Sequence, residues 1–261
     1  MLRHAAFGKK IDSIFLAAVL STAIAVPAIP GMFIAKVDLR GLDARETILF
    51  IAAVALIALF HIANSKALEY TEASIFAFLY NFRIGIVTVL GIIFLAETTQ
   101  PLNIMGGALV FIAGFLLIGQ RGASRKGVLW SMLAAVLISL MNLVDKILIT
   151  EIGWARYMFA SAIFIMCLLW VIVIASKRPV SAELFKEPTT KWLLIFRAVS
   201  AYSFTLALGF GALLSISTYI SALTCITSAI AGIIFLKERD SLLKKTIAGV
   251  IAFAGITFIT M

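Results

Sequence analysis

The chain is a series of long apolar runs separated by short polar segments. A helix that spans a bilayer needs about 20 largely apolar residues, whereas the strands of outer-membrane barrels show short alternating patterns. The runs here are continuous, so they predict transmembrane helices. The nine expected spans are Ile11–Ile34, Thr47–Ile62, Ala73–Ala96, Leu102–Ile118, Val128–Ile149, Tyr157–Ala175, Trp192–Leu214, Ile216–Leu236 and Leu242–Met261.

A seven-residue phrase occurs twice and indicates an internal repeat. Gly91–Glu97 reads GIIFLAE and Gly232–Glu238 reads GIIFLKE, a displacement of 141 residues. The same displacement aligns the glycine-containing runs that follow the two copies. Self-similarity of this kind decides architecture before any single residue does. We therefore expect one membrane domain made of two repeats, residues 1–120 and 127–261.

The two repeats are expected to have opposite orientations in the membrane. An odd number of spans separates the two copies of the phrase, which makes the repeat inverted, as in many carriers. Alternate loops, counted from the N-terminus, hold 15 Lys and Arg residues, and the remaining loops hold 4. Because cytoplasmic loops carry the excess of positive charge, the N-terminus is expected inside and the C-terminus outside.

The first repeat lacks a counterpart of the helix that opens the second repeat. That helix is Val128–Ile149, and a displacement of 141 residues puts its counterpart ahead of Met1. The chain is then either a nine-span variant or the product of a start codon placed too late. An additional apolar segment encoded upstream would indicate the second explanation.

Composition excludes most other classes of protein. The chain is 62% hydrophobic and 13% charged, with a mean hydropathy of +1.10, against about 45–50% and 25% in soluble domains. The net charge of +9 is scattered through loops, which argues against a nucleic-acid partner. We expect an all-α, multi-pass protein of the cell inner membrane, surrounded by the lipid bilayer. No sequence feature indicates a homodimer.

Cysteine and histidine indicate neither a metal site nor a cofactor. Cys167 and Cys225 both lie inside apolar runs, which is typical of small buried side chains rather than a disulfide framework. His4 and His61 adjoin no pair of carboxylates. We therefore expect no metal and no cofactor.

Several segments resemble the EamA-type branch of the drug/metabolite transporter superfamily. They are the two copies of the phrase with the following runs GGALVFIAGFLLI and AGVIAFAGITFI, the segment KALEYTEA at 66–73, and WARYMF at 154–159. The resemblance covers nearly the whole chain. It implies ten helices in two five-helix inverted repeats and transport of a metabolite. The chain departs from this pattern in its missing first helix and in Arg83, which stands at about the place where the family often carries proline.

Arg83 is the most informative polar residue within the expected spans. It is the eleventh residue of Ala73–Ala96, about 15 Å from the nearer end of a helix. An arginine at such depth costs about 2.5–3.5 kcal/mol on insertion scales and should face a cavity, a partner or a substrate. Tyr80, three residues earlier, shares its helix face. We expect Arg83 and Tyr80 to bind an anionic group of a substrate, with a purely structural role as the alternative.

Further candidates for substrate binding could instead have purely structural roles. Arg197 lies near the start of its span, where its long side chain either extends to the headgroups or contacts substrate. One face of Ile216–Leu236 carries small and mostly polar residues, which either form a helix-packing seam or line a substrate pathway. The residues of that face are Thr218, Ser221, Cys225 and Ser228.

Three carboxylates are candidates for coupling or gating. Asp145 is the only one well inside an expected span, so it is the first candidate if transport is coupled to protons through a side chain. Glu97 and Glu238 stand at membrane borders, just before the next helix. There a carboxylate is stabilised by the helix dipole by about 0.3–1 kcal/mol, which favours a structural role over gating.

These features favour a secondary transporter that moves a small polar metabolite, anionic or zwitterionic, by alternating access. No Walker-type loop is present, which excludes ATP hydrolysis by this chain. The alternative is a multi-pass membrane enzyme or assembly factor without transport activity. Such an enzyme requires a cluster of catalytic residues at one membrane face, and the sequence shows no such set. An ion channel is disfavoured because no filter-like motif occurs.

Overall fold

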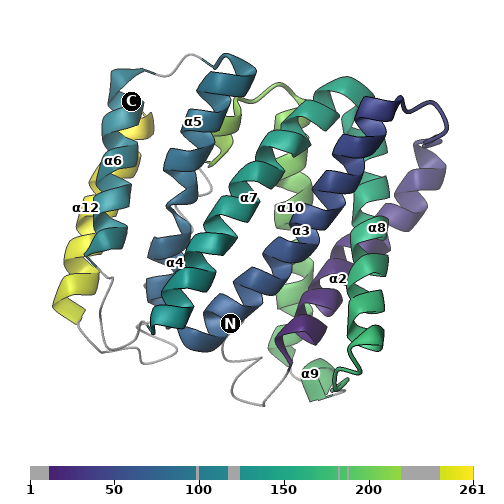
Figure 1. Cartoon of the computed structure of the whole chain (residues 1–261), viewed down its shortest axis with the longest axis horizontal. Helices are drawn as coiled ribbons and strands as arrows, with labels where there is room; N and C mark the ends of the chain where they lie inside the picture. Colours follow the sequence, from purple (N-terminus) through teal and green to yellow (C-terminus); the bar gives the residue numbers. More distant parts are fainter. Residues whose placement is uncertain are drawn as a thin grey trace. The chain divides into compact units, whose positions relative to one another are not determined.

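The computed structural model describes residues 12–97, 100–116, 124–181, 183–186, 188–218 and 242–260. These residues form helices and contain no strand (Figure 1). The helices are α2 (Ser13–Ile34), α3 (Ala44–Tyr70), α4 (Ala73–Tyr80), α5 (Arg83–Leu95), α6 (Pro101–Phe115), α7 (Arg125–Ile152), α8 (Trp154–Ala175), α9 (Glu183–Lys186), α10 (Pro188–Gly209) and α12 (Leu242–Thr260).

Six stretches of the described helices are long and apolar enough to cross a membrane. Large apolar side chains on them are exposed, as lipid-facing positions require; Phe33 and Ile174 are 80% and 72% exposed. The prediction of an all-helical, multi-pass membrane protein is therefore confirmed. The six stretches are Ser13–Ile34, Ala44–Tyr70, Ile75–Leu95, Arg125–Ile152, Trp154–Ala175 and Thr190–Gly209.

The helices depart from the expected spans in three places. α3 continues eight residues beyond the predicted end at Ile62. The span Ala73–Ala96 is interrupted, with α4 ending at Tyr80 and α5 starting at Arg83. α10 ends at Gly209, and a new helical segment starts at Leu214. Most of the expected span Ile216–Leu236 lies outside the described residues.

Local sequence explains where the first two described helices begin. Asp12 accepts hydrogen bonds from the N–H groups of Ile14 and Phe15, at 2.9 and 3.0 Å, and so caps α2. Asp43 and Glu46 form a reciprocal capping box at the start of α3, with N···O distances of 2.7 and 2.9 Å.

The chain forms two compact units, each assembled from two separate segments. The first unit contains Met1–Ser65 and Val144–Ala212, and the second contains Lys66–Leu143 and Leu213–Met261. Both units thus combine residues of the two expected repeats. The helices α2, α8 and α10 belong to the first unit, and α4, α5, α6 and α12 belong to the second.

In the first unit α2 packs antiparallel against α8. Phe15, near the start of α2, contacts Trp170, near the end of α8, with ring centroids 6.0 Å apart. Further along, Ala25 and Ala28 pack against Ala162. Small residues at this crossing let the two backbones approach closely, as is usual between membrane helices.

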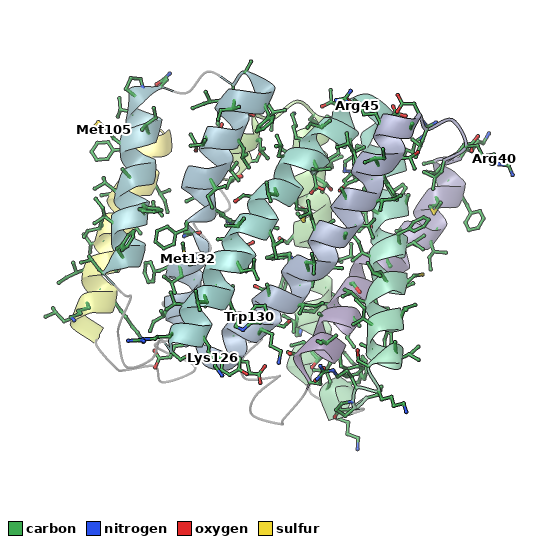
Figure 2. The ribbon with its side chains drawn as sticks, viewed as in Figure 1. Arg40, Arg45, Met105, Lys126, Trp130 and Met132 are labelled. Atoms are coloured by element: carbon green, nitrogen blue, oxygen red, sulfur yellow. The ribbon has the colours of Figure 1, made fainter. Side chains whose placement is uncertain are left out.

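In the second unit α6 packs against α12, and the two helices lie side by side (Figure 1). A Cβ atom on Gly255 would lie 2.6 Å from the carbonyl oxygen of Gly106, so the backbones touch at this point. Met132 of α7 packs against the core cluster of this unit (Figure 2). The buried members of that cluster are Ile75, Phe78, Leu79, Phe82, Ala113, Ala135, Ala248 and Ala252.

The displacement of 141 residues also relates the boundaries of these paired helices. Ser13–Ile34 maps onto Trp154–Ala175, so the bounds of α2 and α8 coincide under this displacement. α6, Pro101–Phe115, maps onto residues 242–256, which lie within α12. Each of these two helix pairs therefore joins helices whose positions in the chain are 141 residues apart.

Even the C-terminal caps of α2 and α8 agree. Lys36 and Lys177, which correspond under the displacement, both adopt a left-handed φ of 49°. Each lies in a Schellman motif, with matching hydrogen bonds from the two residues that follow the cap. Lysine occupies a position at which glycine is usual, so the agreement does not follow from residue type alone.

Candidate functional site

The interruption between α4 and α5 places two non-helical residues, Asn81 and Phe82, inside a membrane span. The N–H groups of Asn81 and Phe82 bond to carbonyls three residues earlier, both at 3.1 Å, and the carbonyl of Asn81 accepts from Ile84 at 2.9 Å. Asparagine competes with helical hydrogen bonding and favours turns. Such tight turns within a helix often mark a functional position.

Arg83 and Tyr80 face each other across this break. The guanidinium carbon of Arg83 lies 4.4 Å from the centroid of the Tyr80 ring, and its Nη1 lies 3.2 Å from the Tyr80 hydroxyl. Phe76 stacks on the Tyr80 ring, with centroids 5.4 Å apart. The two residues are in contact, as their spacing predicts, and the cation–π contact orients the buried guanidinium.

α7 contributes polar residues to the same unit that sequence reasoning missed. The hydroxyl of Ser139 lies 3.3 Å from the carbonyl oxygen of Arg83 and 2.7 Å from that of Ala135. Asn142, one turn later, is 1% exposed. Neither the oxygen nor the nitrogen of its side-chain amide has a hydrogen-bond partner among the described residues. The same is true of Nδ2 of Asn81.

Unpaired buried amides are uncommon because each costs about 1–3 kcal/mol. A polar ligand that accepts from and donates to these amides would remove the cost. The sequence signal available for Asn81 and Asn142 was their polarity within apolar runs, which membrane helices tolerate mainly for packing or function. That signal does not distinguish the two roles without the geometry.

Glu97 caps the N-terminus of a helix that is distant in the sequence. Its carboxylate accepts from the N–H of Leu214 at 2.6 Å, and from the N–H and hydroxyl of Ser215 at 3.2 and 2.6 Å. The sequence predicted a structural role at the start of α6, the next helix. The structure gives this buried carboxylate a capping role at the helix that starts at Leu214 instead.

Asp145 and Lys146 lie in the first unit and do not pair with each other. Asp145 is buried and accepts a hydrogen bond from the hydroxyl of Tyr157. Lys146 donates to the carbonyl oxygens of Leu208 and Ala212, at 3.1 and 3.0 Å, where α10 ends. A cation at the C-terminal end of a helix is favourable because the final carbonyls lack helical partners.

Two of the remaining candidates lie among the described residues. Arg197, on α10 in the first unit, is half-buried and interacts electrostatically with the buried His61. Thr218 is buried in the second unit and donates to the carbonyl of Leu214 at 2.9 Å. The other predicted positions, Ser221, Cys225, Ser228 and Glu238, lie outside the described residues.

The first unit also contains an apolar cavity of about 420 Å³ between α2, α8 and α10. Its polar groups, the Trp170 indole N–H and the Thr22 hydroxyl, bond to each other at 2.8 Å. The cavity therefore offers little to a polar solute. Among the described residues, no group of three His, Cys, Asp or Glu side chains is arranged to hold a metal ion.

Comparison with known proteins shows the fold but no family. No protein-family model and no curated protein match the chain. Twenty-six chains of solved structures match it. One of these, described only as "Crystal structure of protein", has a TM-score of 0.69 and 15% sequence identity, over 96% of this chain and 89% of that chain. At this identity the similarity is one of fold alone.

Proposed function

We propose that this chain is a secondary transporter of the inner membrane that moves a small anionic or zwitterionic metabolite by alternating access. In this proposal it has nine spans in two inverted repeats and is related to the EamA-type carriers that its sequence resembles. The interrupted helix α4–α5 counts as one span, and the segment that starts at Leu214 begins the eighth.

The antiparallel packing of corresponding helices supports the proposal most directly. Inverted repeats are related by a two-fold axis in the membrane plane, which makes corresponding helices antiparallel. The bounds of α2 and α8 coincide under the displacement of 141 residues, and the two helices pack antiparallel. Their identical C-terminal caps at Lys36 and Lys177 extend the correspondence to backbone conformation.

The interrupted helix supports the assignment of the substrate site. Carriers with inverted repeats commonly bind substrate where a transmembrane helix is discontinuous, because the break exposes backbone groups and helix ends. Here the break carries Arg83, whose guanidinium suits a carboxylate or phosphate group. The unpaired Nδ2 of Asn81 and the unpaired amide of Asn142 lie in the same unit and add neutral polar contacts. This combination favours an anionic or zwitterionic substrate over a cation.

Counterflow in proteoliposomes tests the transport function. Purified protein is reconstituted, and vesicles preloaded with unlabelled compound are supplied with labelled amino acids, nucleotides, vitamins or organic anions. A carrier shows saturable counterflow of at least one of these classes. Absence of counterflow across the panel, together with turnover of a lipid-linked compound, would instead favour a membrane enzyme.

Substitution of Arg83 tests the site. Loss of a contact to a charged group costs about 1.5–3 kcal/mol, so Arg83→Gln should weaken transport roughly 10- to 150-fold. Arg83→Lys keeps the charge but loses the planar fork, so it should retain part of the activity. Arg45→Gln is the matched control, because Arg45 is exposed and pairs with Glu151 at 2.9 Å. Transport of every anion at the parent rate by Arg83→Gln would refute the assignment.

A further inference from the structure

The strongest group not used by the proposed substrate site is the buried pair of Asp145 on α7 and Tyr157 on α8. Both side chains are nearly inaccessible, at 2% and 1% exposed. The Tyr157 hydroxyl donates to Oδ1 of Asp145. Gly153, with a φ of 87°, forms the tight junction between the two helices. The hydrogen bond therefore ties α7 to α8 close to the point where the chain reverses.

Several charged side chains around this pair have partners of their own. On α7, Lys146 donates to two carbonyls at the end of α10. Arg45 of α3, labelled in Figure 2, pairs with Glu151 of α7. On α10, Arg197 interacts with His61 of α3.

Arg156, on α8 beside Tyr157, forms no ion pair with a described residue, and within the described ranges no cation pairs with Asp145. A carboxylate buried in a membrane helix without a cation is unfavourable while it is charged. Binding one proton neutralises it. Because Tyr157 donates to Oδ1, the proton adds at Oδ2 and the hydrogen bond to Oδ1 is kept.

A metal cation fits this place less well than a proton. Carriers bind Na⁺ with backbone carbonyls released where helices unwind. α7 is continuous from Arg125 to Ile152 and releases no carbonyl beside Asp145. A proton needs only the carboxylate.

From this geometry we infer that Asp145, with Tyr157 as its hydrogen-bond donor, is the proton-binding site that couples transport to a proton gradient. The inference rests on the proposed carrier function. A proton binds to Asp145 from one side of the membrane and leaves to the other in each transport cycle. The charge of Asp145 therefore changes at a junction of α7, α8 and α10, since the next residue, Lys146, donates hydrogen bonds to carbonyls at the end of α10.

Infrared spectroscopy tests proton binding without any substrate. The reconstituted protein is titrated with acid while the carbonyl band of protonated carboxylic acids is recorded. Wild type and Glu151→Gln, a substitution of an ion-paired carboxylate on the same helix, should both show a band that Asp145→Asn lacks. Tyr157→Phe should shift the frequency of that band because it removes the hydrogen bond. An unchanged band in Asp145→Asn would overturn the assignment.

Proton-driven uptake tests the coupling. Vesicles with the membrane potential clamped at zero receive a pH gradient of one unit, with radiolabelled L-glutamate, L-alanine and the counterflow panel as probes. Coupling to one proton gives about tenfold accumulation in wild type and Glu151→Gln, because one pH unit is tenfold in proton activity. Asp145→Asn should show counterflow but an accumulation ratio of about one.

The two proposals fail in different ways. Tenfold accumulation by Asp145→Asn would overturn the coupling role and leave the carrier intact, and uptake driven by a sodium gradient instead of protons would also overturn it. Absence of counterflow in wild type would refute the carrier function, whereas the infrared band would still report whether Asp145 binds a proton.

Discussion

At the scale of single residues, the unpaired amide of Asn142 separates stability from function. Its amide atoms are buried and have no hydrogen-bond partner among the described residues. For folding alone, an apolar side chain of similar size would be better there, since a buried unpaired polar group costs about 1–3 kcal/mol. A polar residue that weakens the fold is expected where a ligand completes its hydrogen bonds.

Asn142→Leu should therefore raise the thermal stability of the purified protein and lower its transport rate. The gain should be about 1 kcal/mol or more, because the desolvation cost of the amide is removed. Thermal unfolding in detergent measures the first effect and counterflow the second. Thr150→Val, at an exposed position of α7, is the control and should change neither. If Asn142→Leu loses stability instead, the amide has a structural partner and no role in binding.

At the scale of helices, small residues decide which pairs pack closely. Gly255 of α12 touches α6, where an added Cβ would lie 2.6 Å from the Gly106 carbonyl oxygen and 3.0 Å from Leu109 and Val110. Gly249, on the same helix, has open space at the corresponding place. Without a hydrophobic driving force between membrane helices, such close packing is a main source of association.

Gly255→Ala should destabilise the protein by about 1–3 kcal/mol, the usual cost of overpacking. The clash is with backbone, which cannot move aside as a flexible side chain does. Gly249→Ala is the matched control and should cause no loss. Unfolding in mixed micelles with increasing denaturing detergent compares the two variants. Equal stability of both would show that α6 and α12 do not pack at Gly255.

At the scale of the whole molecule, the proposed inverted repeats place corresponding loops on opposite sides of the membrane. Lys36 and Lys177 follow corresponding helices and share backbone conformation and hydrogen bonding. By the distribution of positive charge, the loop with Lys36 is expected outside and the loop with Lys177 inside.

Cysteine labelling in intact cells checks this arrangement. In a background with Cys167→Ser and Cys225→Ser, a membrane-impermeant maleimide should label Lys36→Cys directly. It should label Lys177→Cys only after the membrane is permeabilised. Labelling of both variants from the same side would contradict inverted repeats, whatever the orientation of the N-terminus.

The sequence by itself determined the class of the protein and the places of most helices. In lipid the backbone N–H and C=O groups of each long apolar run must form their hydrogen bonds within that run, and only a helix allows this. It also predicted the contact of Tyr80 with Arg83, three residues apart.

Only the tertiary structure decided which polar groups meet. Glu97 caps a helix that starts 117 residues later, and Lys146 binds carbonyls at the end of α10. The unpaired state of Asn142 likewise depends on the helices around it. Hydrogen bonds form between groups that packing brings within about 3 Å, and for these residues that proximity comes from segments far apart in the chain.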